Sequence, residues 1–512
     1  MSKSRHQKLK NRKRRIQHRL RNISWKAQPS PMLTASNIHY DLSDRSRGLS
    51  AGGIGAMHRL ARHVGLIDEL DRRVSVLKVH LPYHESDHVL NIAYSILSGG
   101  QRLEDIELRR NDEVYLDAMG AQRIPAPSTA GDFCRRFCNL NDIESLMTAI
   151  NETRLGVWLQ QPADFFAEAF IDVDGTLAPT TGECKQGMDY TYKGEWGYHP
   201  LVVSLANTGE PLFLTNRSGN RPSHEGAAER IDQAVELCRR GGFRKITVRG
   251  DTDFSQCTHL DGWDEEGVRF IFGFDARSNL KEIADSLSRR AWKRLERPPK
   301  YEVKTQPRQK PANIKEALVV EKEFRNIRLE SEDVAEFAYS PTACKKTYRM
   351  VVVRKNLSAE KGQRRLFDQI RYFFYITNDE KSPASEIVFE ANTRCNQENL
   401  IEQLKNGVRA TSMPVDNLLS NWAYMVMASL AWTMKAWFAL LLPETGRWAE
   451  KYRQEKMELL RMEFRTFLNA IMRVPAQVVC TGRRIVFRLL SWNKWQHVFL
   501  RGVDQLRGNL RC

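Results

Sequence analysis

We predict an α/β fold for this chain, with a mixed sheet in its middle and a helical segment in front of it. Two observations support this prediction. Apolar residues follow helical spacing over residues 53–155, whereas short apolar runs typical of strands begin near residue 165. From there the order is strand, hairpin, helix, strand, helix, strand, as expected of a mixed sheet with covering helices.

The length and composition are those of a globular protein. The chain has 512 residues, of which 41% are hydrophobic and 28% are charged, so two to four domains are expected. This balance excludes a wholly disordered chain, a fibrous repeat and a disulfide-stapled miniprotein. The nine cysteines are dispersed without a C-x-x-C pair, which indicates reduced thiols in a cytoplasmic protein.

The positive charge is concentrated at the two ends of the chain. The formal net charge is +17; residues 1–40 contain 11 Lys and Arg without any Asp or Glu, and residues 471–512 carry a net +7. The body between them is nearly neutral. Two cationic ends predict a polyanionic partner, with nucleic acid as the first candidate and an anionic membrane surface as the second.

The first part of the chain is predicted to be an arm followed by helices. Residues 1–35 form a basic arm that we expect to be disordered until it meets a polyanion, with Lys13, Arg14 and Arg15 as candidate DNA contacts. Residues 36–155 are predicted to be a helical, DNA-binding domain. Their short helices permit a helix-turn-helix interpretation, and a helical packing domain is the alternative.

Strand patterns then define the predicted core. Residues 156–275 contain the strand FFAEAFIDVDGT, a hairpin that turns at residues 207–210, a helix over 223–242, and the strands KITVRGD and RFIFGFD. Residues 276–364 are predicted to be an inserted, β-rich subdomain. Residues 365–445 resume the core, and residues 446–512 are predicted to be a basic helical region.

One apolar segment imitates a membrane span. It runs from Trp422 to Leu442, but Ser429, Thr433 and Lys435 interrupt it and no second span exists. We therefore predict a buried helix and no membrane partner.

Carboxylates end two of the predicted strands. Alternation places Asp172 and Asp174 on one face of the first strand, and Asp251 directly follows the strand KITVR. Such carboxylates are costly to bury unless a cation or a reaction uses them. Asp253, two residues further on, is predicted to cap a short helix.

A third charged group lies on a predicted helix. At 100° per residue, Arg394, Glu398 and Lys405 fall within about 40° of one another. An i, i+4 pair alone is usually a surface salt bridge. Together with two strand-end aspartates, however, Glu398 could complete a carboxylate set that holds two divalent cations for phosphodiester chemistry. The two cationic side chains would then contact substrate phosphates.

These motifs resemble those of bacterial insertion-sequence transposases of the DDE class, and most closely the IS thirteen-eighty branch. Asp174-Gly175-Thr176 matches a D-x-T strand end, and the segment 249–252 matches an R-G-D-S/T strand end. Arg394, Glu398 and Lys405 match the signature Y-x2-R-x3-E-x6-K. The chain departs from that signature at its first position, where Ala391 replaces the Tyr.

The resemblance implies a ribonuclease-H-like mixed sheet core with a β-rich insertion, preceded by a helical N-terminal domain. It implies that Asp174, Asp251 and Glu398 are the catalytic residues and the ligands of Mg²⁺, for which Mn²⁺ could substitute. The implied partners are double-stranded DNA, as terminal inverted repeats and as target, and a second copy of the chain on that DNA. The implied location is the bacterial cytoplasm, at the nucleoid.

The same residues permit a second interpretation. D-x-D-G-T is also the signature of haloacid-dehalogenase-type phosphatases, in which Asp172 would be the nucleophile and Asp174 the general acid and base. That interpretation leaves Arg394, Glu398 and Lys405 without a role. A catalytically inactive DNA-binding derivative and another kind of nuclease are further alternatives.

Overall fold

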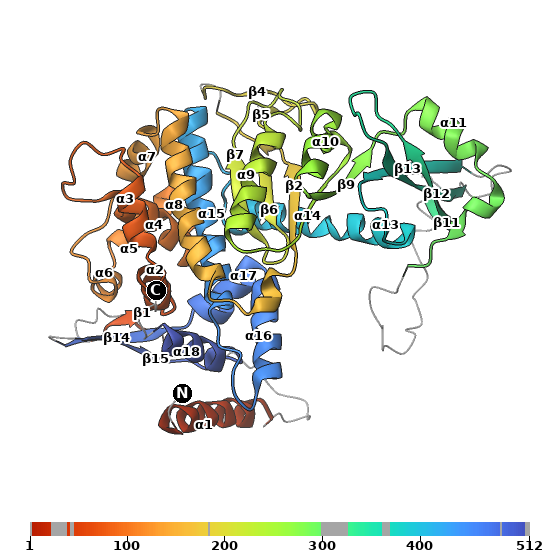
Figure 1. Cartoon of the computed structure of the whole chain (residues 1–512). Helices are drawn as coiled ribbons and strands as arrows, with labels where there is room; N and C mark the ends of the chain where they lie inside the picture. The colour runs from red at the N-terminus through yellow and green to blue at the C-terminus, as the bar shows by residue number, and fades with distance from the viewer. Residues whose placement is uncertain are drawn as a thin grey trace.

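A nine-stranded mixed sheet runs through the protein, in the order β10-β11-β12-β13-β9-β8-β2-β6-β7 (Figure 1). The computed structural model describes residues 3–21, 38–40, 46–182, 185–297, 326–360, 369–481 and 484–506. The strands of this sheet are β2 (Ala169–Gly175), β6 (Leu201–Leu205), β7 (Glu210–Thr215), β8 (Ile246–Gly250), β9 (Arg269–Phe274), β10 (Lys293–Arg294), β11 (Asn326–Tyr339), β12 (Tyr348–Glu360) and β13 (Gln369–Thr377).

The first strand of the sheet, β2, lies between partners of both directions. It pairs in parallel with β8 and antiparallel with β6, while β8 pairs in parallel with β9 and β6 forms a hairpin with β7. The hairpin turns between Leu205 and Glu210, as predicted. The prediction of a mixed α/β sheet is thereby confirmed.

The predicted β-rich insertion is part of the same sheet. Residues 276–364 were predicted to be an inserted, β-rich subdomain; within them β11 and β12 pair with each other, and β12 pairs with β13, which in turn pairs with β9. The reason is that β9 would otherwise be an open edge, and the antiparallel strands satisfy its backbone groups. Residues 298–325 and 361–368 of this part lie outside the described residues.

Helices pack against the sheet, and a cluster of N-terminal helices lies beside it. Residues 54–158 form a cluster of helices, and α15 (Leu418–Leu440) runs between that cluster and the hairpin of β6 and β7 (Figure 1). The helices before the sheet are α2 (Ile54–His63), α3 (Leu66–Arg73), α4 (Glu85–Leu97), α5 (Ile106–Arg110), α6 (Glu113–Met119), α7 (Pro127–Arg135) and α8 (Leu140–Trp158). The later ones are α9 (Ala227–Arg240), α10 (Cys257–Glu265), α11 (Ser278–Ser286), α13 (Ala384–Thr393) and α14 (Cys395–Glu402).

The apolar segment is a buried helix, as predicted. Every residue of α15 from Ser420 onward is buried, including Lys435, whose Nζ donates a hydrogen bond to the Leu460 carbonyl. None of the described helices is long and apolar enough to cross a membrane.

A buried carboxylate joins the helical cluster to the sheet. Glu210, at the start of β7, accepts hydrogen bonds from Arg154 Nε at 3.0 Å, Trp158 Nε1 at 3.1 Å and Trp437 Nε1 at 2.9 Å. Arg154 and Trp158 lie on α8 and Trp437 lies on α15. Glu210 and Arg154 are almost fully buried, so each provides the opposite charge that compensates the burial of the other.

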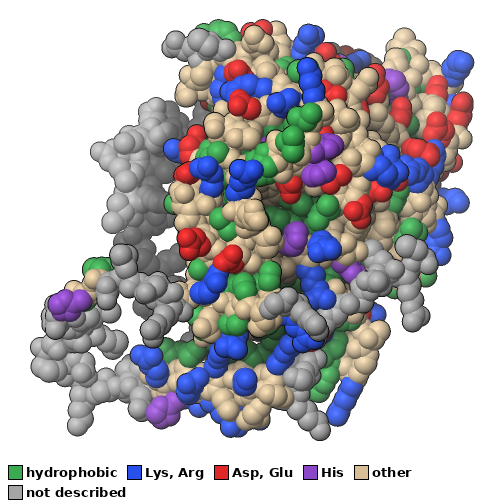
Figure 2. Space-filling model, turned by 90° about the vertical axis from the view of Figure 1, so that its left-hand side faces the viewer, with side chains coloured by type: hydrophobic (Ala, Val, Ile, Leu, Met, Phe, Trp, Pro, Cys, Tyr) green, Lys and Arg blue, Asp and Glu red, His purple; other side chains and the backbone are tan. Residues whose placement is uncertain are grey.

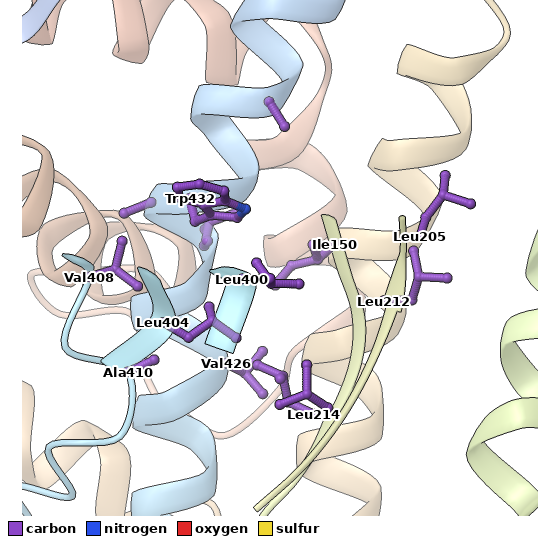
Figure 3. Packing of buried hydrophobic residues seen from close by; sticks show 14 of the residues in the cluster. Ile150, Leu205, Leu212, Leu214, Leu400, Leu404, Val408, Ala410, Val426 and Trp432 are labelled. Carbon is purple, nitrogen blue, oxygen red and sulfur yellow. The ribbon is translucent and has the colours of Figure 1, made fainter. Parts of the chain in front are cut away.

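The helix that carries Glu398 is held by apolar packing. Figure 3 shows Leu400 and Leu404 between α15, at Val426 and Trp432, and the β6–β7 hairpin. The predicted regular helix through Arg394, Glu398 and Lys405 is only partly present: Arg394 lies in the turn between α13 and α14, and residues Gln403–Gly407 form a π-helical turn. The π turn changes the angular spacing on which the prediction relied.

Both ends of the chain differ from the prediction. The described part of the expected disordered arm is helix α1 (Lys3–Arg21), and Arg12 on it donates hydrogen bonds to the Leu489 carbonyl at 2.7 Å and the Ser491 carbonyl at 3.1 Å. The C-terminal region is not wholly helical. It contains the hairpin β14 (Ala476–Thr481) and β15 (Arg484–Leu489), which β1 (Gly48–Leu49) extends, and the helices α16 (Ala449–Arg461), α17 (Phe464–Phe467) and α18 (Gln496–Gln505). Contacts between the two ends of the chain stabilise these elements. Sequence patterns could not predict these contacts, because the residues that form them lie more than 400 positions apart.

Glu210→Gln tests the buried junction. The variant keeps the shape of the side chain but leaves the Arg154 charge uncompensated. We therefore expect the free energy of unfolding to fall by about 3–5 kcal/mol. Glu266→Gln is the matched control, because it removes an exposed ion pair with Arg239 and should cost below about 1 kcal/mol. Urea denaturation of both variants measures the difference; equal losses would contradict a structural role of Glu210.

Candidate active site

Two aspartates meet at one edge of the sheet. In the parallel pair of β2 and β8, Asp172 is opposite Arg249, and two residues further along each strand bring Asp174 and Asp251 to the same edge. The Asp251 carboxylate also accepts a hydrogen bond from the Asp253 backbone N–H at 3.0 Å and so caps the short 3₁₀ helix that follows. The predicted cap role of Asp253 is therefore wrong: its side chain is exposed.

Asp172 has a structural role beside this edge. Its two carboxylate oxygens accept hydrogen bonds from Arg249 Nε at 2.7 Å and Nη2 at 3.0 Å, and both side chains are buried. Arg249 Nη1 also donates to the Glu390 carbonyl at 3.2 Å and to Thr393 Oγ1 at 2.5 Å, in the last turn of α13. One guanidinium thus holds two strand ends and the helix end that precedes Arg394.

The two predicted cationic side chains both reach β2. Arg394 Nη1 lies 3.1 Å from Asp174 Oδ2, and Lys405 Nζ lies 3.2 Å from Thr176 Oγ1. Asp174, Asp251, Arg394 and Lys405 are therefore brought together, although they come from separate parts of the sequence.

Glu398 lies on the adjacent helix with its side chain exposed. Its neighbour Gln397 is buried, and Gln397 donates a hydrogen bond to the carbonyl of Val202, the residue paired with Asp174 across β2 and β6. Gln397 therefore fixes the first turn of α14 over the strand beside the aspartates. Within the described residues, Glu398 itself forms no hydrogen bond or ion pair.

The environment of the aspartates favours their neutral forms. Burial raises the pKa of Asp174 to about 6, and the negative charge of Asp251 acts in the same direction, whereas the guanidinium of Arg394 opposes both. Burial likewise raises the pKa of Asp251, and the charge of Asp253 adds to this effect. A site that disfavours two adjacent carboxylates in their charged forms is one that a bound cation would stabilise.

The donor set fits a hard divalent cation in part. Asp174 and Asp251 offer carboxylate oxygens at adjacent strand ends, which are the ligands that Mg²⁺ and Mn²⁺ prefer. Among the residues that the structure describes, however, no three His, Cys, Asp or Glu side chains are grouped closely enough to hold a metal ion. The structure thus brings together two of the three predicted carboxylates and leaves Glu398 facing solvent.

The sequence analysis missed three side chains that shape this edge. Arg249 and Gln397 are described above. The third is His199, whose Nε2 would lie only 2.8 Å from a Cβ atom added to Gly175, so the glycine of the D-G-T motif makes room for an imidazole. Burial lowers the pKa of His199. Arg249 stands in the R-G-D segment, but the sequence did not show that its partner is Asp172, and spacing gave no signal for Gln397 or His199 because their partners lie far away in the chain.

The predicted DNA contacts at the N-terminus lie elsewhere. Lys13, Arg14 and Arg15 are exposed on α1, which packs on the C-terminal elements below the sheet in Figure 1. They do not approach Asp174.

Comparison with known proteins adds the family. The family model for the transposase DDE domain, group 1, matches residues 43–510, which is most of the chain. The chain belongs to this family. It is therefore a DDE-type transposase, and the strand-end aspartates lie within the matched region. DDE transposases use divalent metal ions, which agrees with the carboxylate donors at this edge.

A solved structure is also similar to this transposase. It is titled as a cryo-EM structure of the piggyBac transposase synaptic complex with hairpin DNA, with 10% sequence identity, 83% of each chain covered and a TM-score of 0.33. No curated protein sequence matches the chain. The family assignment depends on the family model alone.

The phosphatase interpretation disagrees with the position of Asp172. A nucleophilic carboxylate needs an open approach for the substrate phosphorus. Asp172 is fully buried, and Arg249 occupies both of its oxygens. The transposase family and this geometry together exclude Asp172 as a nucleophile.

The raised pKa of Asp174 predicts a pH-dependent stability. Because the pKa is higher in the folded state than the ordinary value of 3.8, the contribution of Asp174 is most favourable below pH 4 and is lost as the pH rises through about 6. Asp174→Asn should therefore gain stability relative to the wild type between pH 4 and pH 7, by up to about 3 kcal/mol. Thermal unfolding in EDTA across this range measures the gain; a difference independent of pH would contradict it.

Proposed function

We propose that this transposase binds the terminal inverted repeats of a bacterial insertion sequence of the IS thirteen-eighty branch, cuts there, and joins the 3′ ends to target DNA. The observation that carries the proposal is the sheet edge at which Asp174 and Asp251 are flanked by Arg394 and Lys405. Carboxylates can bind metal ions, and the neighbouring cations can bind phosphates. Phosphodiester chemistry needs both.

The strand order supports a ribonuclease-H-like core. The hairpin of β6 and β7 follows β2 on one side, and the parallel strands β8 and β9 lie on the other. This order places the ends of the first and fourth core strands side by side, so that one aspartate from each can serve the same site. The antiparallel extension through β11 and β12 then returns the chain to the helices that carry Arg394 and Glu398.

Asp174, Asp251 and Glu398 are proposed as the ligands of Mg²⁺, with Mn²⁺ as a substitute. When bound, the metal ions would lower the pKa of a water or a 3′-hydroxyl and stabilise the leaving oxygen. The exposed Glu398 is free to turn toward the aspartates, since α14 is held by Gln397 and by apolar packing rather than by Glu398.

Arg394 and Lys405 are proposed to bind the backbone of the cut strand. Without DNA, Arg394 pairs with Asp174, and burial lowers the pKa of Lys405 near Thr176. A phosphate at this edge would give each cation a stronger partner than it has here. Cutting two transposon ends together also favours a homodimer on DNA.

Asp251→Asn separates DNA binding from cutting. The variant keeps the size and the capping oxygen of the side chain but removes its charge, so we expect DNA to be bound normally while cleavage of a plasmid with inverted repeats stops in Mg²⁺. Asp253→Asn is the matched control, since its exposed carboxylate lies two residues away. Retained cleavage in Asp251→Asn would make Asp251 structural.

Glu398→Gln tests the third carboxylate. We expect cleavage to fall by several orders of magnitude, because metal placement supplies several kcal/mol of transition-state stabilisation. Glu402→Gln is the control on the same helix: Glu402 accepts a hydrogen bond from Asn406 at 2.7 Å and is exposed. If both variants cleave equally well, Glu398 is not the third ligand and the signature match is coincidental.

A further inference from the structure

A cavity lies between the two ends of the chain, away from the sheet edge. Its volume is about 700 Å³, within the range of small-molecule sites. Helix α1, the start of α16 and the segment 492–501 supply its walls. Helix α1 contributes His6, Leu9, Lys10 and Lys13 to the lining, and Trp448 and Trp492 lie among the residues from the other two segments.

One face of α1 points into this cavity. The four residues that α1 contributes lie at positions 6, 9, 10 and 13. Residues three or four positions apart lie on the same side of a helix, so these four form one stripe. Contacts on the same helix hold it in place: Arg12 binds the carbonyls of Leu489 and Ser491, and Arg5 pairs with Asp504 at 3.2 Å. The cavity therefore has a fixed wall on the side of α1.

The charge in the cavity is only partly compensated. Glu455 accepts hydrogen bonds from His497 and Arg501, each at 2.8 Å. By contrast, Lys13 and Lys494 form no ion pair with any residue that the structure describes. Lys and Arg side chains also gather in the lower part of Figure 2, at the height of α1 in Figure 1. An anionic ligand would complete this charge distribution.

Aromatic rings stand among these cations. Trp448 is 57% exposed, although a large apolar side chain is normally covered. Trp492 also lines the cavity, with Lys13 Nζ 6.0 Å from its ring centre, and Arg501 lies 3.8 Å from the ring centre of Tyr452. Contacts to the phosphates of duplex DNA need no aromatic ring. Accessible rings beside cations are instead typical of sites where unpaired bases stack.

We infer that this cavity binds an unpaired nucleotide of a DNA strand, with its base against Trp448 or Trp492 and its phosphates at Lys13 and Lys494. The inference rests on the proposed function, because strand cutting at a transposon end is what would supply unpaired DNA. It adds a second DNA site, formed jointly by the two ends of the chain. The helix α1 would then act as one wall of a specific pocket and not only as a basic tail.

The test compares two labelled oligonucleotides of equal charge on the full chain in EDTA. One is a twelve-nucleotide oligothymidylate, and the other has abasic sites at every position. We expect the wild type to bind the oligothymidylate about tenfold more tightly, since stacking accounts for the difference. The double variant Trp448→Ala with Trp492→Ala should bring the ratio of the two dissociation constants close to one, while Trp448→Phe with Trp492→Phe should keep it.

Two control variants make the test specific. Phe373→Ala removes another exposed ring beside a cation, Lys355, but on β13 and outside the cavity, and it should leave the ratio unchanged. Lys13→Gln with Lys494→Gln should weaken binding of both oligonucleotides and flatten the salt dependence. Lys281→Gln, on α11, should not. Equal midpoints of thermal unfolding show that the variants fold.

Two results would overturn the inference: equal binding of both oligonucleotides by the wild type, or a ratio that survives loss of both tryptophans. Cleavage of inverted repeats in Mg²⁺ is measured separately. A wild type that shows the base preference but never cuts would contradict the proposed function alone, and one that cuts without the preference would contradict this inference alone.

Discussion

The ion pair between Asp172 and Arg249 is the interaction on which the geometry of the site depends. It joins neighbouring parallel strands just before both end, and the same guanidinium binds the last turn of α13. The two buried charges are tolerated because each oxygen of the Asp172 carboxylate accepts a hydrogen bond from a nitrogen of the Arg249 guanidinium. Asp174, Asp251 and Arg394 all follow directly in the chain from residues that this pair fixes.

The fixed strand ends hold the carboxylates of Asp174 and Asp251 close together, where their negative charges are only partly compensated. Burial raises the pKa of both aspartates, the charge of Asp251 adds to this effect at Asp174 and the charge of Asp253 adds to it at Asp251, and Arg394 relieves only part of it. A bound cation would therefore stabilise the charged forms of these two carboxylates. Arg394 compensates part of the charge of Asp174 through the contact between Arg394 Nη1 and Asp174 Oδ2 at 3.1 Å.

Burial connects this site to the rest of the molecule. Helix α15 packs on the N-terminal helices and on the β6–β7 hairpin, and Glu210 joins the two through Arg154 and Trp437. The helix α14 packs in the same cluster through Leu400, and the π-helical turn after it does so through Leu404. The position of Glu398 therefore depends on packing against the helical cluster as well as on the strands of the sheet.

The mixed sheet, the strand-end aspartates, the burial of α15 and the family resemblance could all be predicted from the amino-acid sequence. Each follows from local signals: periodicity, turn residues, or a short motif such as Asp174-Gly175-Thr176. Long-range contacts were needed to show that Asp172 is structural, that Asp251 and not Asp253 is the cap, and that β11 and β12 extend the core sheet. These outcomes depend on partners many residues away, such as Arg249 for Asp172, and no local pattern records which distant partner a charged or edge group will find.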